Sequence, residues 1–238
     1  MTDLETARHP RSLAKRARIL ETAMRHFAER GYQAARIEDM AAELGIAKGS
    51  IFQHYASKEG LFLAAYKKAV AMFPRYQDAP AAVWERGFWA TLAYWLERTE
   101  HMVREDWIPY RLTLIGDYGS DLSLRREINR YLANEDPYGT AAFVRWGVER
   151  GELRRDVDVE LTTSILDWTM ERFQDALVTE ELFPGFFRRH DAGPDRTHRR
   201  IEQFLQVLRG AIGAPPELVV RRPRREKPPE RRTRARRS

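Results

Sequence analysis

Two short amphipathic segments joined by a glycine constrain this chain most. Residues 37–44 and 48–55 carry apolar side chains on one face of each predicted helix. The connection is Leu44-Gly45-Ile46, and Gly45 can adopt the left-handed backbone conformation that a sharp turn requires. Two helices that cross steeply at such a turn leave the second one facing outward. The sequence therefore predicts a helix-turn-helix.

The second of these helices has a surface that suits DNA. With Ile51 and Tyr55 toward the core, its exposed residues are small or can form hydrogen bonds: Lys48, Gly49, Ser50, Gln53 and His54. A single helix fits the major groove, which is about 12 Å wide. The pattern therefore favours double-stranded DNA as a partner.

The ordered residues around this motif resemble those of TetR/AcrR-type regulators. The matching stretches are Arg18-Ile19-Leu20, Phe27 to Tyr32, Ile37 to Ala41, Gly45 to Tyr55 and Ser57-Lys58-Glu59, within about residues 15–65. The resemblance implies an all-helical homodimer that places two recognition helices in successive major grooves of a palindromic operator. It also implies a larger C-terminal domain that binds a small-molecule effector.

The resemblance further implies roles for individual residues. Lys48, Ser50 and Gln53 would face the groove, and His54 and Lys58 would contact phosphate. Gly49 would let the backbone approach the DNA closely. The alternative for each of these polar side chains is simple solvation.

Three positions depart from the family pattern. Ala35-Arg36 and Ala47 replace the Ser or Thr that usually caps the two short helices, and each lost cap typically costs about 1 kcal/mol. We therefore expect a looser helix-turn-helix, with Glu38 and Asp39 partly compensating at the positive end of the first short helix. Phe52 stands where the family often has a Tyr whose hydroxyl can reach a phosphate, and Arg36 is a candidate replacement for that contact.

The rest of the chain also has a helical pattern, which predicts an all-α fold. Expected helices span residues 12–31, 37–44, 48–55, 58–74, 80–103, 105–116, 121–134, 137–150, 158–181 and 195–212. Gly31 is the expected C-terminal cap of the first helix, and Ser57 is the expected N-cap of the helix at 58–74. The predicted domains are a DNA-binding head at 1–58, a ligand-binding and dimerisation domain at 59–214 and a disordered tail at 215–238.

Charge is distributed unevenly along the chain. Residues 1–58 carry ten Lys and Arg against seven Asp and Glu, and residues 221–238 carry ten against two. The chain as a whole is only +6, so the middle is acidic. The basic tail is either a phosphate-binding arm or a solvated appendage.

Aromatic residues are abundant between residues 84 and 187, which favours a hydrophobic or aromatic effector. The candidate ligand-binding residues are Trp89, Trp107, Tyr110, Arg111, Trp146 and Trp168. Core packing is the alternative for any one of the aromatic residues, and a surface ion pair is the alternative for Arg111.

Broad apolar stripes on residues 159–177 and 201–212 suit the pairing of the last two helices with those of a second copy, although a purely internal core would look similar.

Other function classes lack support in the sequence. Cysteine is absent, and no nucleotide-binding loop, nucleophile elbow or paired-histidine metal motif occurs, so we expect no enzyme activity, cofactor or metal. No run of about 18 apolar residues and no signal-peptide pattern is present, which predicts a cytoplasmic protein without a membrane partner. The favoured function is a repressor released from its operator by a hydrophobic ligand. The alternative is a helical ligand-binding or adaptor module with a vestigial DNA-binding head.

Overall fold

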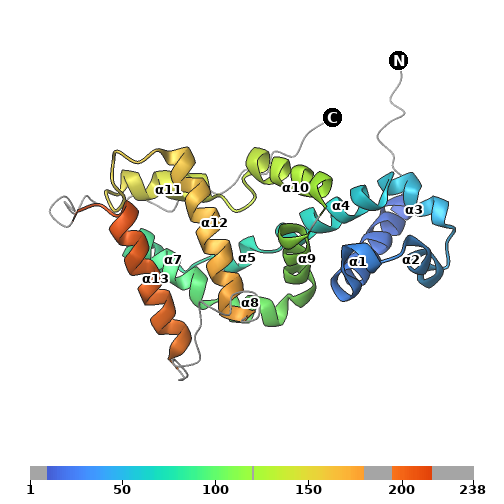
Figure 1. Ribbon diagram of the computed structural model, residues 1–238, viewed down its shortest axis with the longest axis horizontal. Helices are drawn as coiled ribbons and strands as arrows, with labels where there is room; N and C mark the ends of the chain where they lie inside the picture. Colours follow the sequence, from blue (N-terminus) through green and yellow to red (C-terminus); the bar gives the residue numbers. More distant parts are fainter. Residues whose placement is uncertain (1–9, 120, 180–194, 216–238) are drawn as a thin grey trace, which may run out of the picture. The chain divides into compact units, whose positions relative to one another are not determined.

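The computed structural model describes residues 10–119, 121–179 and 195–215 (Figure 1). These ranges are helical and contain no strand, apart from an isolated antiparallel bridge between Leu153 and Gly213. The predicted all-α fold is confirmed. The predicted disordered tail lies outside the described residues from residue 216 onward.

The chain forms two compact units. Among the described residues, unit 1 contains 10–74, 106–119 and 121–137, and unit 2 contains 75–105, 138–179 and 195–215. The domain boundary expected at residue 58 stays a prediction.

Unit 1 is built around the helix-turn-helix. Its helices are α1 (Pro10–Ala34), α2 (Ile37–Leu44), α3 (Lys48–Tyr55), α4 (Lys58–Val70), α9 (Trp107–Tyr118) and α10 (Leu122–Glu135). Helix α4 packs against α1 and α9, with Phe27 edge-on to Phe62 at 5.1 Å between ring centroids. Gly116 lets α9 come close to α4, because a Cβ there would lie 2.7 Å from a ring carbon of Tyr66. The short helices α2 and α3 thus rest on a rigid aromatic core.

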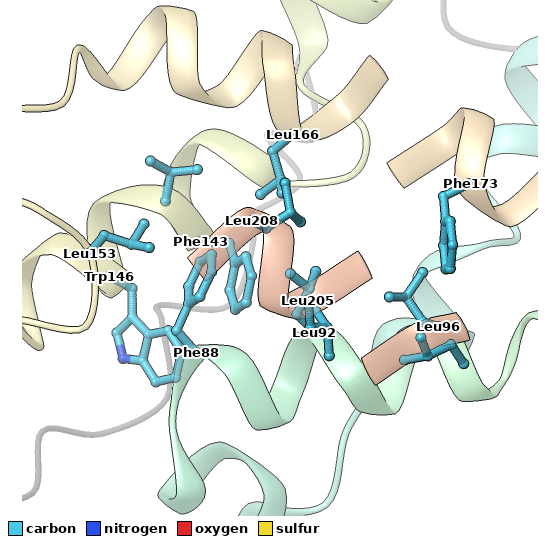
Figure 2. Packing of buried hydrophobic residues seen from close by; sticks show 12 residues of the cluster. Phe88, Leu92, Leu96, Phe143, Trp146, Leu153, Leu166, Phe173, Leu205 and Leu208 are labelled. Atoms are coloured by element: carbon cyan, nitrogen blue, oxygen red, sulfur yellow. The ribbon is translucent and has the colours of Figure 1, made fainter. Parts of the chain in front are cut away.

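Unit 2 contains α5 (Pro74–Gln77), which begins at its boundary, α6 (Ala81–Arg86), α7 (Phe88–Glu97), α8 (Thr99–Glu105), α11 (Thr140–Glu149), α12 (Val159–Val178) and α13 (Arg196–Ile212). Its core joins α7, α11, α12 and α13, as Figure 2 shows. Phe88 stacks on Phe143 with 4.3 Å between ring centroids, and Phe173 stacks on Phe204 at 4.0 Å. The aromatic richness of the sequence therefore fills this core to a large extent.

One predicted helix was wrong in its extent. Residues 80–103 form α6, α7 and most of α8 instead of a single helix, because the chain breaks at Gly87, whose φ is 103°. The Glu152 carboxylate accepts a hydrogen bond from the Phe88 backbone N–H at 2.9 Å and thereby holds the start of α7. The break depends on a glycine, because L side chains rarely adopt this φ; a Cβ at residue 87 would in addition displace the Glu152 carboxylate, which would lie 2.2 Å from it.

Smaller differences occur at helix ends. Helix α4 ends at Val70 rather than near residue 74, and the short α5 was not predicted. Gly31 interrupts α1 with a φ of 77°, as expected, but a further turn follows it to Ala34. The remaining helices agree with the prediction to within a few residues.

Candidate DNA-binding surface and effector residues

Helix α3 is anchored by one face and exposed on the other. Ile51 and Tyr55 are buried, whereas Lys48, Gly49 and Gln53 are exposed, and Ser50, Phe52 and His54 are half-buried. The turn before it is made by Gly45, whose φ of 63° and ψ of 36° are left-handed, as the sequence predicts. The helix-turn-helix geometry is therefore confirmed.

Helix α1 fixes the end of α3. The Tyr55 hydroxyl donates a hydrogen bond to the Arg16 carbonyl oxygen at 2.9 Å, and the Arg16 guanidinium lies 5.4 Å from the Tyr55 ring centroid. Burial raises the pKa of the Tyr55 hydroxyl, so it remains protonated and able to donate. This anchor holds the last turn of α3 against α1.

Helix α2 is tied to α1 by ion pairs. The Glu43 carboxylate contacts His26 Nε2 at 2.8 Å and also pairs with Arg25, while Asp39 pairs with Arg30 at 2.5 Å. The hydrogen bond with His26, followed by the charge of Arg25, holds the pKa of the Glu43 carboxyl below its ordinary value. These pairs join α2 to α1 at two positions, Asp39 and Glu43.

The predicted cations have partners within the protein. Lys48 Nζ donates to Glu38 Oε1 at 2.6 Å and lies 5.6 Å from the Phe52 ring centroid. Lys58 Nζ donates to the Gln33 carbonyl oxygen at 3.1 Å and lies 4.9 Å from the Tyr32 ring centroid. Partial burial lowers the pKa of the Lys58 ammonium. Both lysines are thus held in place beside the helix-turn-helix.

The other predicted DNA-contacting residues lie on α3, except Arg36, which lies just before α2. Ser50 Oγ accepts a hydrogen bond from Lys15 Nζ at 3.2 Å, and the exposed Arg36 precedes α2. A Cβ added at Gly49 would meet no atom within 4 Å among the described residues, so packing inside the chain does not require this glycine. The sequence did not predict the hydrogen bond of Lys15 with Ser50 or that of Lys48 with Glu38, because each joins residues from two different helices.

The expected absence of two caps is confirmed. Within the described part of the chain, the side chains of Arg36 and Ala47 cap neither α2 nor α3. Ser57 caps α4 as predicted, with its Oγ accepting from the Gly60 N–H at 2.9 Å. Glu38 and Asp39 lie in the first turn of α2, where negative charge is favourable.

The six candidate effector residues divide between the units. Trp107, Tyr110 and Arg111 lie on α9 of unit 1, and Trp89, Trp146 and Trp168 lie on helices of unit 2. Their exposures differ widely: Trp146 is 5% exposed, Tyr110 7%, Trp107 47% and Trp168 63%. Only Trp89 and Trp146 pack on the same described cluster. The ligand-binding role of all six stays a prediction.

An aromatic cluster around Trp84 was not predicted as a site. Trp84 lies edge-on to Trp146 at 5.2 Å and to Phe143 at 6.1 Å between ring centroids. The indole nitrogens of Trp84 and Trp146 are both buried and have no hydrogen-bond partner among the described residues. Buried donors are normally paired, so two together in one cluster are unusual.

An all-α chain that presents an anchored helix beyond a left-handed turn, with lysines beside it, is a helix-turn-helix DNA-binding protein. Residues 19–65 match the family model of bacterial regulatory proteins, tetR family. The HTH-type transcriptional repressor AcnR of Corynebacterium glutamicum is 30% identical over 166 residues, which cover 69% of this chain and 82% of that protein. The chain belongs to the tetR family and is a transcriptional regulator.

Solved structures show the same fold. A tetR family transcription regulator from Shewanella sp. PV-4 aligns with a TM-score of 0.61 and 19% identity, covering 84% of this chain and 99% of that one. The regulator FadR from Bacillus subtilis, solved in complex with stearoyl-CoA, aligns with a TM-score of 0.58 and 19% identity, covering 81% and 96%.

None of the helices in the described ranges combines the length and apolar character needed to cross a membrane.

Proposed function

We propose that the protein is a cytoplasmic, homodimeric repressor that leaves a palindromic operator when a hydrophobic or aromatic small molecule binds it. The observation that carries this proposal is the outward face of α3, anchored by Ile51 and Tyr55 and flanked by Lys48 and Lys58. A relative that is 30% identical over 166 residues is named a transcriptional repressor, which supports repression rather than activation. The protein acts by binding and needs no catalysis.

The proposed DNA contacts follow from position on the helix-turn-helix. Lys48, Ser50 and Gln53 face the groove, where lysine and glutamine side chains can hydrogen-bond to base edges. Arg36, His54 and Lys58 contact phosphate, which orients the protein on the duplex. Gly49 leaves space for the sugar-phosphate backbone, and the Phe52 ring lies under the Lys48 ammonium.

Dimerisation is supported by an apolar face on α12. Leu161, Ile165 and Trp168 follow one another at spacings of four and three residues and are 56%, 38% and 63% exposed in the single chain. Val207 on α13 is 70% exposed. A second copy that covers these faces removes large apolar side chains from water, which is the main driving force for association.

The effector is proposed to bind in unit 2, near Trp89 and Trp146. The buried indole donors of Trp84 and Trp146 suit a ligand with an apolar body and a hydrogen-bond acceptor. Trp168, Trp107, Tyr110 and Arg111 remain candidates for further contacts. Binding is coupled to DNA release by linkage: the ligand stabilises a dimer whose recognition helices no longer match the spacing of about 34 Å between successive grooves.

The test uses the full-length protein and a duplex that it selects from a random pool. Fluorescence anisotropy of the labelled duplex is followed while a long-chain fatty acid, a long-chain acyl-CoA and a set of aromatic acids are added in turn. We expect one of these classes of compound to release the duplex and, over the same concentration range, to change the tryptophan fluorescence of the protein.

A matched variant locates the effector site. Trp146→Phe keeps most of the apolar volume but removes one buried indole donor, so it should weaken release without changing affinity for the duplex. Release that is unaffected by this change places the effector elsewhere. If no probe releases the duplex, the proposal of a hydrophobic effector is contradicted, while DNA binding stands on its own measurement.

A further inference from the structure

A carboxylate lies among the cations of the proposed DNA-contacting surface. Glu38 Oε1 on α2 accepts a hydrogen bond from Lys48 Nζ at 2.6 Å, and Lys48 is the first residue of α3. Both side chains are 50% exposed. The pair therefore joins the two helices of the helix-turn-helix at a surface that water and DNA can reach.

Glu38 also interacts with two other cations of this surface. The hydrogen bond from Lys48 holds the pKa of the Glu38 carboxyl below its ordinary value of 4.5, and the charge of Arg36 acts in the same direction. The negative charge of Glu38 raises the pKa of Lys58 and so opposes the effect of burial on that ammonium. Glu38 is therefore ionised at neutral pH and offsets positive charge among Arg36, Lys48 and Lys58.

Such a carboxylate affects random and cognate DNA unequally. Binding to random duplex depends on cations that replace the counterions of phosphate. A lysine that is paired with a carboxylate must give up that pairing before it can replace a counterion at a phosphate. At a cognate site, contacts with base edges compensate for opening the pair, whereas random duplex offers no such contacts.

We propose that Glu38 is a specificity-determining residue. Its carboxylate holds Lys48 in the free protein and releases it where base contacts compensate, so it lowers affinity for random duplex more than affinity for the operator. The inference rests on the proposed function, because it takes Lys48 to contact DNA.

The test compares wild type with Glu38→Gln on a selected operator and on a random-sequence duplex over a range of salt concentrations. On the random duplex, the variant should bind about threefold more tightly, and the slope of log K against log salt should become steeper by about one, as for one added phosphate contact. Affinity for the operator should change less, so the ratio of the two affinities falls. Glutamine keeps an amide oxygen that can accept from Lys48 but loses the charge, whereas Glu38→Ala removes the acceptor as well and should give the same direction of change.

Two controls separate this effect from a change of net charge. Glu21→Gln removes an equal charge from unit 1 and frees Lys68, its partner at 3.4 Å across α1 and α4, so it should leave the salt slope unchanged. In a Lys48→Ala background, Glu38→Gln should make the slope steeper by much less, because the lysine that is paired with Glu38 is absent and only its longer-range effect on Arg36 and Lys58 remains.

The inference is overturned if Glu38→Gln leaves the slope and the affinity ratio unchanged while wild type selects an operator. It is also overturned if Glu21→Gln has the same effect, or if the effect of Glu38→Gln is undiminished without Lys48. Failure of the wild type to select any duplex is a different result, since it contradicts the proposed function and removes the inference with it.

Discussion

Phe52 shows how one missing hydroxyl can change the strength of DNA binding. The side chain is half-buried on α3, and its ring lies under Lys48 Nζ. Tyrosine, which the resemblance to the family leads us to expect there, adds a hydroxyl without changing the ring. We therefore expect the protein with Phe52 to bind its operator less tightly than the same protein with a tyrosine at residue 52.

Phe52→Tyr should therefore raise affinity for the selected operator by about fivefold or more, because a hydrogen bond to a charged phosphate contributes about 1 kcal/mol or more. Fluorescence anisotropy with labelled operator measures this change. The melting temperature of the free protein serves as the control and should stay constant. Equal affinity of both proteins would show that residue 52 does not reach phosphate.

The contacts of the Glu43 carboxylate with Arg25 and His26, which join α2 to α1, should be sensitive to acid. Its pKa in the folded protein is lowered, first by the hydrogen bond with His26 and then by Arg25. A lowered pKa means that stabilisation is fully present above the ordinary value of 4.5 and is lost as the pH falls through the lower, folded value. The link is therefore intact at neutral pH.

Glu43→Gln should melt at a lower temperature than wild type at neutral pH, and the difference should shrink once the pH falls below 4.5. Thermal unfolding followed by circular dichroism at several pH values measures the difference. A gap between the two proteins that stays constant down to strongly acidic pH contradicts this role for the carboxylate.

At the scale of elements, α2 and α3 start without side-chain caps. The Ala47 carbonyl oxygen accepts from the Ser50 N–H at 2.9 Å, which marks the first turn of α3, but an alanine side chain cannot accept a hydrogen bond itself. Ser57 does so at the start of α4. The two short helices should therefore exchange amide hydrogens faster than α4, because their first turns open more easily.

Ala47→Ser supplies the missing acceptor and should stabilise the protein by about 1 kcal/mol. Chemical denaturation gives the free energy of unfolding, and hydrogen exchange should show slower exchange across residues 48–55. Ala42→Ser is a control, because it adds the same hydroxyl at an exposed position inside α2. Equal effects of Ala47→Ser and Ala42→Ser would show that a cap at residue 47 does not limit the stability of α3.

The helices with strong local signals were predictable from sequence. Gly45 and the apolar spacing on either side predict α2 and α3, and Ser57 predicts the start of α4. The break at Gly87 was not predictable, because it is held by Glu152, which lies 64 residues from Phe88 in the chain. The same limit applies to Lys48, whose role can be predicted from its place on a helix, while its pairing with Glu38 depends on how two helices cross.

At the scale of the whole molecule, the exposed face of α12 predicts the oligomeric state. Trp168→Glu places a charge in the centre of the proposed interface and should convert the dimer to a monomer, since burying an unpaired charge is costly. Analytical ultracentrifugation measures the mass. Leu122→Glu changes an equally exposed apolar residue of α10, 66% exposed, and should leave the dimer intact. A Trp168→Glu dimer would place the interface on another surface.

Helix α3 is proposed to read DNA sequence, and selection of bound duplexes from a random pool decides whether it does. Wild type should enrich a symmetric site whose half-sites are about 10 base pairs apart, and Gln53→Ala should enrich the same site with a weaker preference at one position in each half. Enrichment of no sequence by the wild-type protein would contradict the claim.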